Sequence, residues 1–221
     1  ILVLADGTVF RGFSLGAEQT VVGEVVFNTA MTGYQEVLTD PSYYHQMVTM
    51  TYPHIGNVGI NPLDKESARV GASALIMREI SPVVSNWRAD QSLSDFLTAH
   101  GVTAITGVDT RRLTRHLRDS GAQSGCIMKG DQVEQALEKA RQFKGTVGLD
   151  CAQKVTCQEA YEWSQGSDHV CALNPAKRLE AHVVVYDFGV KQQILRLLVD
   201  RGCRVTVVPA QTSVEQVLAL Q

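Results

Sequence analysis

The chain has 221 residues, of which 44% are hydrophobic and 19% are charged, the ordinary proportions of a globular protein with a sizeable core. It carries 20 basic and 23 acidic residues for a formal net charge of −3, and no basic block occurs, which argues against a nucleic-acid-binding protein. No apolar run approaches the roughly 18 residues of a membrane-spanning helix, and the first residues reach charge and glycine too early for a signal peptide.

The first third of the chain is predicted to be rich in β-structure. Four runs have strand patterns, and the first two are joined by Asp6-Gly7, a dipeptide typical of hairpin turns. Between the third and fourth runs, residues 32–43 contain Gly33 and Asp40-Pro41, which predict a short helical turn that ends in a tight loop. The predicted strands span residues 1–4, 8–13, 23–28 and 46–51.

From about residue 69, predicted strands and helices intermix. Ser92 and Asp95 have the spacing of a capping box, and Gly101 suits the end of that helix. Asp109 is the expected N-cap of the next helix. The predicted helices span residues 92–100, 109–120 and 131–142, and the predicted strands span residues 69–77, 102–105 and 124–128. This mixture predicts a β-rich α+β domain over residues 1–143.

Residues 144–181 have no clear period and contain Gly, Ser, Asn and Pro, so they are predicted to connect two domains, with one or two short elements of their own. The second domain is expected to begin at residue 182. Its pattern differs from that of the first domain, and the chain as a whole is therefore predicted to belong to the α/β class.

The residues from 182 onward predict one βαβ unit. The run HVVVY is a continuous apolar strand of the kind found in parallel sheets. A helix over 189–201 is expected to turn Ile194, Leu197 and Leu198 inward, and the next strand covers 204–208; Ser213 is placed to cap a further helix. Because one βαβ unit cannot bury both faces of a parallel sheet, we expect residues 182–221 to be the truncated start of a larger doubly wound domain.

The cysteines favour a reducing compartment. Their number is odd, their spacing is wide and no C-x-x-C pair occurs, so neither a disulfide framework nor a zinc site is indicated. The histidines form no H-x-x-x-H pair, so no metal site is expected. We therefore expect a cytoplasmic protein. The cysteines are Cys126, Cys151, Cys157, Cys171 and Cys203.

Two patterns resemble catalytic nucleophiles, and each has a simpler interpretation. The run GFSLG places Ser14 in a G-x-S-x-G motif, but no helical pattern follows it, whereas a nucleophile elbow needs a strand before the serine and a helix after it. Cys126 falls inside a predicted strand and Cys203 at the start of another, away from the helix N-terminus or cation that activates a thiol. We expect a glycine-bounded strand end and two small buried apolar residues.

Three further polar segments are candidates for a functional role. In the run Asp40-Pro41-Ser42-Tyr43 the simplest role of Ser42 is to cap the turn or a following helix. The helix start at residues 109–115 is dense in arginine; a capped, solvated helix explains it, and an arginine contact with a partner protein is the alternative, which charge reversal at Arg112 and Arg115 would test. Lys191, after the strand of the second domain, is expected to face solvent.

Two long runs carry a resemblance to a known family. They are FNTAMTGYQEVLTDPSYYHQMVTMTYPHIGNVG at residues 27–59 and GVDTRRLTRHLRDSGAQSG at residues 107–125. Together they closely resemble the small, glutamine-handling subunit of carbamoyl phosphate synthase, of the stand-alone bacterial type. The resemblance covers almost the whole chain, and residues from 182 onward resemble the start of a class I glutamine amidotransferase domain.

The resemblance implies an enzyme subunit that releases ammonia from glutamine for a large subunit, which makes carbamoyl phosphate from bicarbonate and ATP for arginine and pyrimidine synthesis. The implied partner is that large subunit, in a heterodimer or a higher oligomer; ATP and Mg would be used there, and no cofactor is expected on this chain. Ser42 matches the family serine that contacts the bound glutamine.

The family's catalytic cysteine, histidine and glutamate have no counterpart in these 221 residues, so no catalytic residue is assigned and no glutaminase activity is expected of this chain alone. Two alternatives to a fragment of the enzyme subunit stay open. The first is a non-catalytic interaction module derived from that subunit. The second is a serine hydrolase that uses Ser14.

Overall fold

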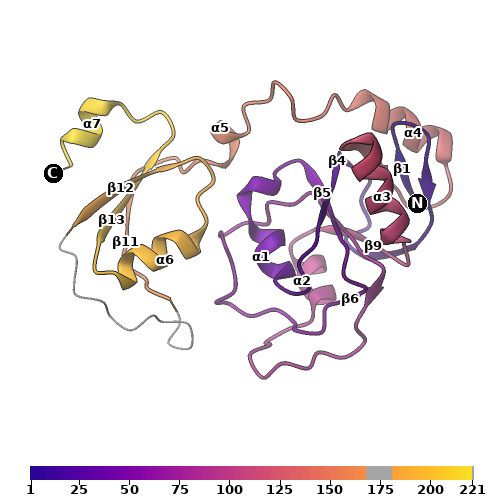
Figure 1. Ribbon diagram of the computed structural model, residues 1–221, viewed down its shortest axis with the longest axis horizontal. Helices are drawn as coiled ribbons and strands as arrows, with labels where there is room; N and C mark the ends of the chain where they lie inside the picture. The colour runs from indigo at the N-terminus through magenta and orange to yellow at the C-terminus, as the bar shows by residue number, and fades with distance from the viewer. Residues whose placement is uncertain (168–180, 221) are drawn as a thin grey trace. The chain divides into compact units, whose positions relative to one another are not determined.

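The computed structural model of the chain describes residues 1–167 and 181–220. It divides into two compact units, Ile1–Leu149 and Asp150–Gln221, which are described in turn (Figure 1). Residues 168–180 of the expected connector, with Cys171, lie outside the described residues. No helix in the described part of the chain is long and apolar enough to cross a membrane.

The first unit, all of which is described, is built on an eight-stranded sheet with the order β2-β1-β10-β4-β5-β7-β9-β3. The four central strands β4, β5, β7 and β9 run parallel, and the outer pairs are antiparallel. A small sheet joins β6 (His54–Ile55) to β8 (Glu79–Ile80). The strands of the large sheet are β1 (Leu2–Leu4), β2 (Val9–Phe10), β3 (Phe13–Gly16), β4 (Val21–Asn28), β5 (Gln46–Met50), β7 (Ala74–Ile76), β9 (Thr103–Thr106) and β10 (Gln123–Ile127).

Two helices of the first unit begin at the caps that the local sequence predicts. The Ser92 hydroxyl accepts a hydrogen bond from the Asp95 N–H, and Asp109 Oδ1 accepts one from the Arg112 N–H. Such caps satisfy backbone donors that the first turn leaves without partners. The helices of the first unit are α1 (Tyr34–Thr39), α2 (Leu93–Ala99), α3 (Thr110–Ser120) and α4 (Val133–Gln142), and the 3₁₀ turn η1 (Pro41–Tyr43) follows α1.

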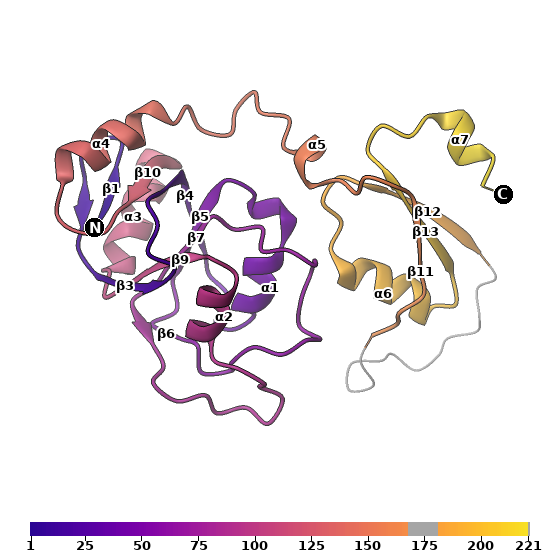
Figure 2. The ribbon, with the colours of Figure 1, turned by 180° about the vertical axis from the view of Figure 1, so that it is seen from behind.

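The large sheet buries both of its faces, because neighbouring residues of a strand point to opposite sides. Leu75 lies in the cluster that α1 and α2 cover, whereas Ala74 and Ile76 lie in the cluster that α3 covers through Leu113 and Leu117. Helix α4 packs on β1 and β10 in a third cluster. Figures 1 and 2 show these helices around the strands from opposite sides.

Two strand predictions in this unit were wrong in extent. The strand predicted over 8–13 is interrupted at Arg11-Gly12, because β2 pairs with β1 at one edge of the sheet and β3 pairs with β9 at the other edge. The strand predicted over 69–77 is reduced to β7, because the N–H groups of Gly71 and Ala72 bond to the carbonyl of Leu38 instead of to a strand. Partners far away in sequence decided both outcomes: strands in the first case and a carbonyl of α1 in the second.

The second unit contains the predicted βαβ arrangement. Strands β12 (His182–Asp187) and β13 (Arg204–Pro209) are parallel, and α6 (Gln192–Asp200) connects them. Strand β11 (Tyr161–Trp163) adds to β13 antiparallel, giving the order β11-β13-β12 within the described residues. Ser213 caps α7 (Val214–Leu218) in a full capping box with Gln216, and α5 (Ala152–Val155) lies in the expected connector.

The inward face of α6 differs in part from the prediction: Leu198 packs on the apolar cluster of the second unit as expected, but Ile194 does not. Ile194 is 51% exposed, whereas Leu195 is fully buried against Val205 and Val207 of β13. The stripes that begin at residues 194 and 195 both fit a period of 3.6 residues, so the amino-acid pattern alone allowed either. Packing on the valines of β13 selects the stripe with Leu195.

Candidate functional site

In the turn at residues 40–43, the hydroxyl of Ser42 takes no part in the hydrogen bonds that form the turn. The side chain of Asp40, not that of Ser42, caps the turn by accepting a hydrogen bond of 2.9 Å from the Ser42 N–H. Pro41 fixes the first residue of the turn. The capping role considered for Ser42 is therefore wrong. Its side chain is exposed, and its hydroxyl makes no hydrogen bond within the described residues.

Contacts from three directions hold this turn in place. The Tyr43 hydroxyl accepts a hydrogen bond of 3.0 Å from Asn28 Nδ2 at the end of β4. Tyr44 pairs with Ala72 in an isolated bridge. Gly71 lies so close to the turn that an added Cβ atom would overlap the carbonyl oxygen of Asp40. The Ser42 hydroxyl is thus presented from a braced segment of backbone.

The backbone beside this turn is strained. His45 has a φ of 63°, and it is the only non-glycine residue with a positive φ among the described residues. Its carbonyl accepts a hydrogen bond of 3.0 Å from the Glu24 N–H, and Gly23 leaves room for that approach. Non-glycine residues in this conformation persist only where the surrounding structure enforces it, and they concentrate at functional sites. The strain adds an independent reason to regard residues 40–45 as the candidate site.

The irregular loop after β5 is tied to helix α1. The Tyr34 hydroxyl accepts a hydrogen bond of 2.7 Å from the Val58 N–H, and Gln35 exchanges two hydrogen bonds with the backbone of Asn61. Burial raises the pKa of Tyr34, so the phenol stays neutral and able to donate. These hydrogen bonds fix the segment that follows β6 on helix α1.

Glu36 of α1 is a half-buried acid whose ionisation opposes folding. Burial raises the pKa of its carboxyl, and the nearby acids Asp64 and Glu66 raise it further. The native state therefore binds a proton more tightly than the unfolded chain does, and the stability present at low pH is lost as the pH rises through the native pKa.

We expect Glu36→Gln to unfold at a higher temperature than the parent protein at pH 7.5 and at nearly the same temperature at pH 4, because glutamine keeps the shape and removes the charge. Thermal unfolding followed by circular dichroism at both pH values measures this. A variant that is less stable at pH 7.5 would show instead that the ionised carboxylate stabilises the first turn of α1 through the helix dipole.

The two nucleophile-like patterns have structural roles. Ser14 lies in the edge strand β3 opposite Ile105, and residues 17–20 after it form no helix, so the arrangement of a nucleophile elbow is missing. Cys126 is fully buried in β10, and burial raises the pKa of its thiol. Cys203 is half-buried and packs on the apolar cluster of the second unit. The predictions are confirmed for Ser14 and Cys126 and only in part for Cys203, and the setting of Ser14 does not support a serine hydrolase.

Asp187 is a buried acid that sequence reasoning passed over in favour of Lys191. Its carboxylate ends β12 and accepts hydrogen bonds from the N–H groups of Cys157, Gly189 and Val190, at 2.6, 2.9 and 2.9 Å. The D-x-G spacing is the signal that could have identified it. It organises the turn into α6 from within the second unit. Among the described residues, no group of three His, Cys, Asp or Glu side chains is arranged to hold a metal ion.

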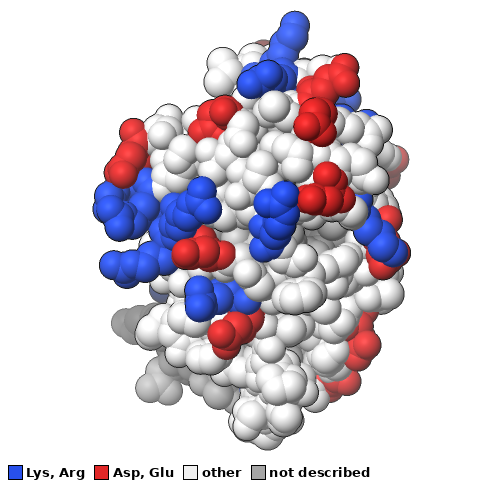
Figure 3. Space-filling view, turned by 90° about the vertical axis from the view of Figure 1, so that its right-hand side faces the viewer, with Lys and Arg blue, Asp and Glu red and all other residues white. Residues whose placement is uncertain are grey.

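The arginines at the start of α3 differ in the contacts that they make. The Arg112 guanidinium lies 5.0 Å from the centre of the Phe10 ring, a cation–π arrangement, while Arg111 and Arg115 project as exposed side chains. Figure 3 shows one face of the molecule, where Lys and Arg are interspersed with Asp and Glu. No continuous basic stripe of the kind that tracks nucleic acid crosses that face.

Comparison with known proteins decides the family. The family described as "Carbamoyl-phosphate synthase small chain, CPSase domain" matches residues 2–127, which include the Ser42 turn and α3. The chain belongs to this family. The resemblance carried by residues 27–59 and 107–125 is therefore confirmed.

Curated relatives named "Carbamoyl phosphate synthase small chain" match the whole chain. That of Photorhabdus laumondii is 56% identical and is covered over 58% of its length. Those of Pseudomonas aeruginosa and Escherichia coli are 58% and 56% identical, covered over 60% and 59% of their lengths. The chain thus spans about three-fifths of the length of these small chains. Among solved structures, an aminopeptidase from Aneurinibacillus sp. strain AM-1 reaches a TM-score of only 0.31 at 10% identity, which supports no argument.

Proposed function

We propose that this chain provides the non-catalytic part of the glutamine site in a carbamoyl phosphate synthase small chain. The observation that carries the proposal is the Ser42 hydroxyl, which is exposed on a braced turn and has no hydrogen-bond partner within the described residues. A hydroxyl can donate to one group and accept from another. Because no internal bond must break first, Ser42 is ready to contact a small polar substrate such as glutamine.

In the proposed reaction, glutamine loses its amide nitrogen as ammonia, which a large chain combines with bicarbonate and ATP to form carbamoyl phosphate for arginine and pyrimidine synthesis. ATP and Mg act on the large chain, and this chain needs no cofactor. The second unit, with its parallel β12 and β13, is proposed as the beginning of a class I glutamine amidotransferase domain. The cytoplasmic location stays a prediction.

The catalytic nucleophile is proposed to lie outside these 221 residues, because none of their cysteines stands in the G-x-C-x-G setting of the family. The thiols also differ from activated nucleophiles. Burial raises the pKa of Cys126 and of Cys157, and the nearby Asp187 carboxylate raises that of Cys157 further. A thiol with a raised pKa carries little of the thiolate that attacks a carboxamide.

We expect the purified 221-residue protein to release no ammonia from glutamine above the buffer rate. A coupled glutamate dehydrogenase assay, run with and without a thiol-alkylating reagent, measures this. Ammonia release that alkylation abolishes would contradict the proposal, since it would place a working nucleophile among Cys126, Cys151, Cys157, Cys171 and Cys203.

The functional test of the proposal is reconstitution with a large chain. A full-length small chain that contains this sequence should support carbamoyl phosphate formation from glutamine, bicarbonate and ATP when it is mixed with the large chain. The large chain alone should need added ammonia. If the mixture also depends on added ammonia, the chain is an interaction module and not part of a glutamine-handling enzyme.

A further inference from the structure

A hollow of about 510 Å³ on the first unit is lined by residues that share one property: each carries hydrogen-bond donors suited to an anion. Three are arginines and three are threonines, and no carboxylate belongs to the described residues that line it. Ser42 is not among them, so the hollow is separate from the candidate glutamine site. The lining residues are Thr29, Thr51, Arg111, Thr114, Arg115 and Arg118.

The fold brings these residues together from three places in the sequence. Thr29 and Thr51 directly follow the last residues of β4 and β5, which are adjacent and parallel, with Asn28 opposite Met50. Ligands of parallel sheets gather at the carboxyl ends of strands. The other four residues lie on α3 at the spacing i, i+3, i+4 and i+7, which puts them on one stripe of the helix.

Helix α3 is oriented so that this stripe stays outside the core. Leu113 and Leu117 are buried in the cluster that joins α3 to the sheet, and α3 packs against β4 and β5. The polar stripe beside them therefore overhangs the strand ends where Thr29 and Thr51 lie. Burial of the two leucines fixes the position of α3, so the backbone that carries the arginines is already in place before a ligand binds.

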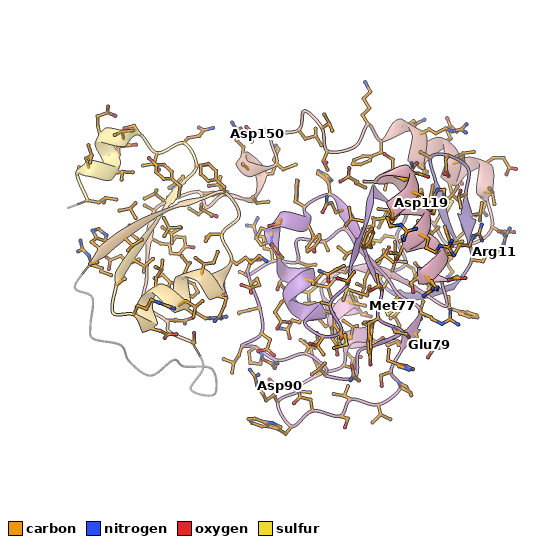
Figure 4. All side chains as sticks on the ribbon, in the orientation of Figure 1. Arg11, Met77, Glu79, Asp90, Asp119 and Asp150 are labelled. Atoms are coloured by element: carbon orange, nitrogen blue, oxygen red, sulfur yellow. The ribbon has the colours of Figure 1, made fainter. Side chains whose placement is uncertain are left out.

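Two of the three positive charges in the hollow have no acidic partner within the described residues. Arg111 and Arg115 make no ion pair or hydrogen bond within the described residues. Arg118 pairs with Asp119, labelled on α3 in Figure 4, at 2.9 Å, but both side chains of that pair are well exposed and the pair is correspondingly weak. Three guanidinium groups around one hollow repel one another, and a bound anion would relieve that repulsion.

A second and independent observation also points to a ligand. The hydroxyl oxygen of Thr114 is buried and has no hydrogen-bond partner within the described residues. Buried hydroxyl groups are nearly always hydrogen-bonded in native proteins, and an exception calls for an explanation such as a bound ion. Thr114 lines the hollow between Arg111 and Arg115. Its hydroxyl oxygen has almost no accessible surface in this structure, so it gains an anion held by these guanidinium groups as its partner once its side chain turns toward the hollow.

We propose that this hollow binds a phosphate group, either as inorganic phosphate or as part of a small phosphomonoester. Guanidinium groups bind phosphate oxygens in pairs of parallel hydrogen bonds, and threonine hydroxyls donate to the remaining oxygens. The volume exceeds what a single phosphate ion fills, which leaves room for the organic part of a monoester. The proposal is independent of the glutamine chemistry.

The test is a titration of the whole chain with inorganic phosphate and, separately, with glycerol 3-phosphate at pH 7.5, against chloride at equal ionic strength. Binding is followed by amide shifts in two-dimensional NMR spectra. We expect saturable shifts centred on Arg111, Thr114 and Arg115. Tighter binding of glycerol 3-phosphate would identify a monoester as the ligand, and equal or weaker binding would identify free phosphate.

Arg115→Gln should weaken phosphate binding at least about tenfold, because it removes one charge-assisted contact. Arg112→Gln is the matched control: it removes the same charge from the same helix, outside the lining residues, and should change the dissociation constant less than about twofold. Arg115→Gln should keep the parent's melting temperature, which excludes misfolding as the cause of weaker binding. Arg112→Gln should lower the melting temperature slightly, because it removes the contact with the Phe10 ring.

Three results would overturn the proposal. Shifts that do not saturate, or that chloride reproduces, would show only general charge screening. Equal weakening by Arg112→Gln would show that the net charge of α3 matters and the hollow does not. If phosphate fails to bind and Arg115→Gln weakens association with the large chain instead, the hollow is a docking surface for a protein.

Discussion

Leu38→Ala should lower the free energy of unfolding of the first unit by about 2–5 kcal/mol, the range found when a fully buried leucine is truncated. Leu38 is completely buried in the cluster between α1, α2 and the sheet. Removing its side chain loses the buried apolar surface and leaves a cavity in the cluster. The cavity stays open because neighbours such as Leu75 are held in place by the strand β7. A loss near the middle of this range is a large part of the stability of a typical domain.

Hydrogen exchange of the β5 and β7 amides under increasing urea measures this loss, because those strands lie at the centre of the sheet. Leu63→Ala is the matched control: Leu63 is 46% exposed, and its truncation should change the stability by less than about 0.5 kcal/mol. Equal effects of the two substitutions would mean that the packing of α1 on the sheet is looser than described.

Gly71→Ala should destabilise the first unit by about 3 kcal/mol, near the upper end of the cost of overpacking. The added methyl group would meet the carbonyl of Asp40 and Cα of Pro41, which are backbone atoms that cannot rotate away. The backbone N–H of Gly71 also bonds to the Leu38 carbonyl at 2.8 Å, so the two segments cannot separate without losing that bond. The turn must shift, and Ser42 shifts with it.

Chemical denaturation of Gly71→Ala beside Gly121→Ala separates the two costs of a new methyl group. Gly121 has a φ of 82° and a ψ of 175°, a backbone conformation nearly restricted to glycine, and open space around its Cβ position, so alanine there carries only the backbone cost, on the order of 1–3 kcal/mol. The amide shifts of Ser42 and Tyr43 should move in Gly71→Ala alone. Unchanged shifts would show that Gly71 does not position the turn.

Features set by short stretches of sequence were predicted well. Ser92, Asp109 and Ser213 cap helices as expected, since a cap depends on residues only three positions apart. The turn at Asp6-Gly7 is confirmed for the same reason, and the parallel βαβ unit is confirmed because the periods of its two strands and its helix are each local. The helix over 109–120 begins and ends within one residue of its prediction.

Features set by distant partners were not predicted. The break at Arg11-Gly12 depends on which edge each short strand joins, and the inward face of α6 depends on the valines of β13. The contact of Gly71 with Asp40 joins residues of two segments that share no local pattern. The hollow beside α3 combines residues 29, 51 and 111–118, and its buried Thr114 hydroxyl is visible only in the folded chain.

The role of Ser42 could be predicted only in part from the local sequence. The residues around it predict a turn, and the structure confirms the turn but assigns its cap to Asp40. Nothing local indicates a substrate contact, and the proposed role comes from the family resemblance. The strained His45 and the bracing glycines Gly23 and Gly71 show why this segment has a fixed shape, which sequence patterns do not express.

The most direct measurement is the dependence of carbamoyl phosphate synthesis on glutamine concentration for Ser42→Ala in a full-length small chain paired with its large chain. The account predicts a KM for glutamine raised about tenfold, as expected for a lost hydrogen bond to a polar substrate, with unchanged rates when ammonia replaces glutamine. The stability should change by less than about 0.5 kcal/mol, since Ser42 is exposed. An unaltered KM for glutamine would contradict the proposed contact, and equal losses with ammonia would place Ser42 outside the glutamine site.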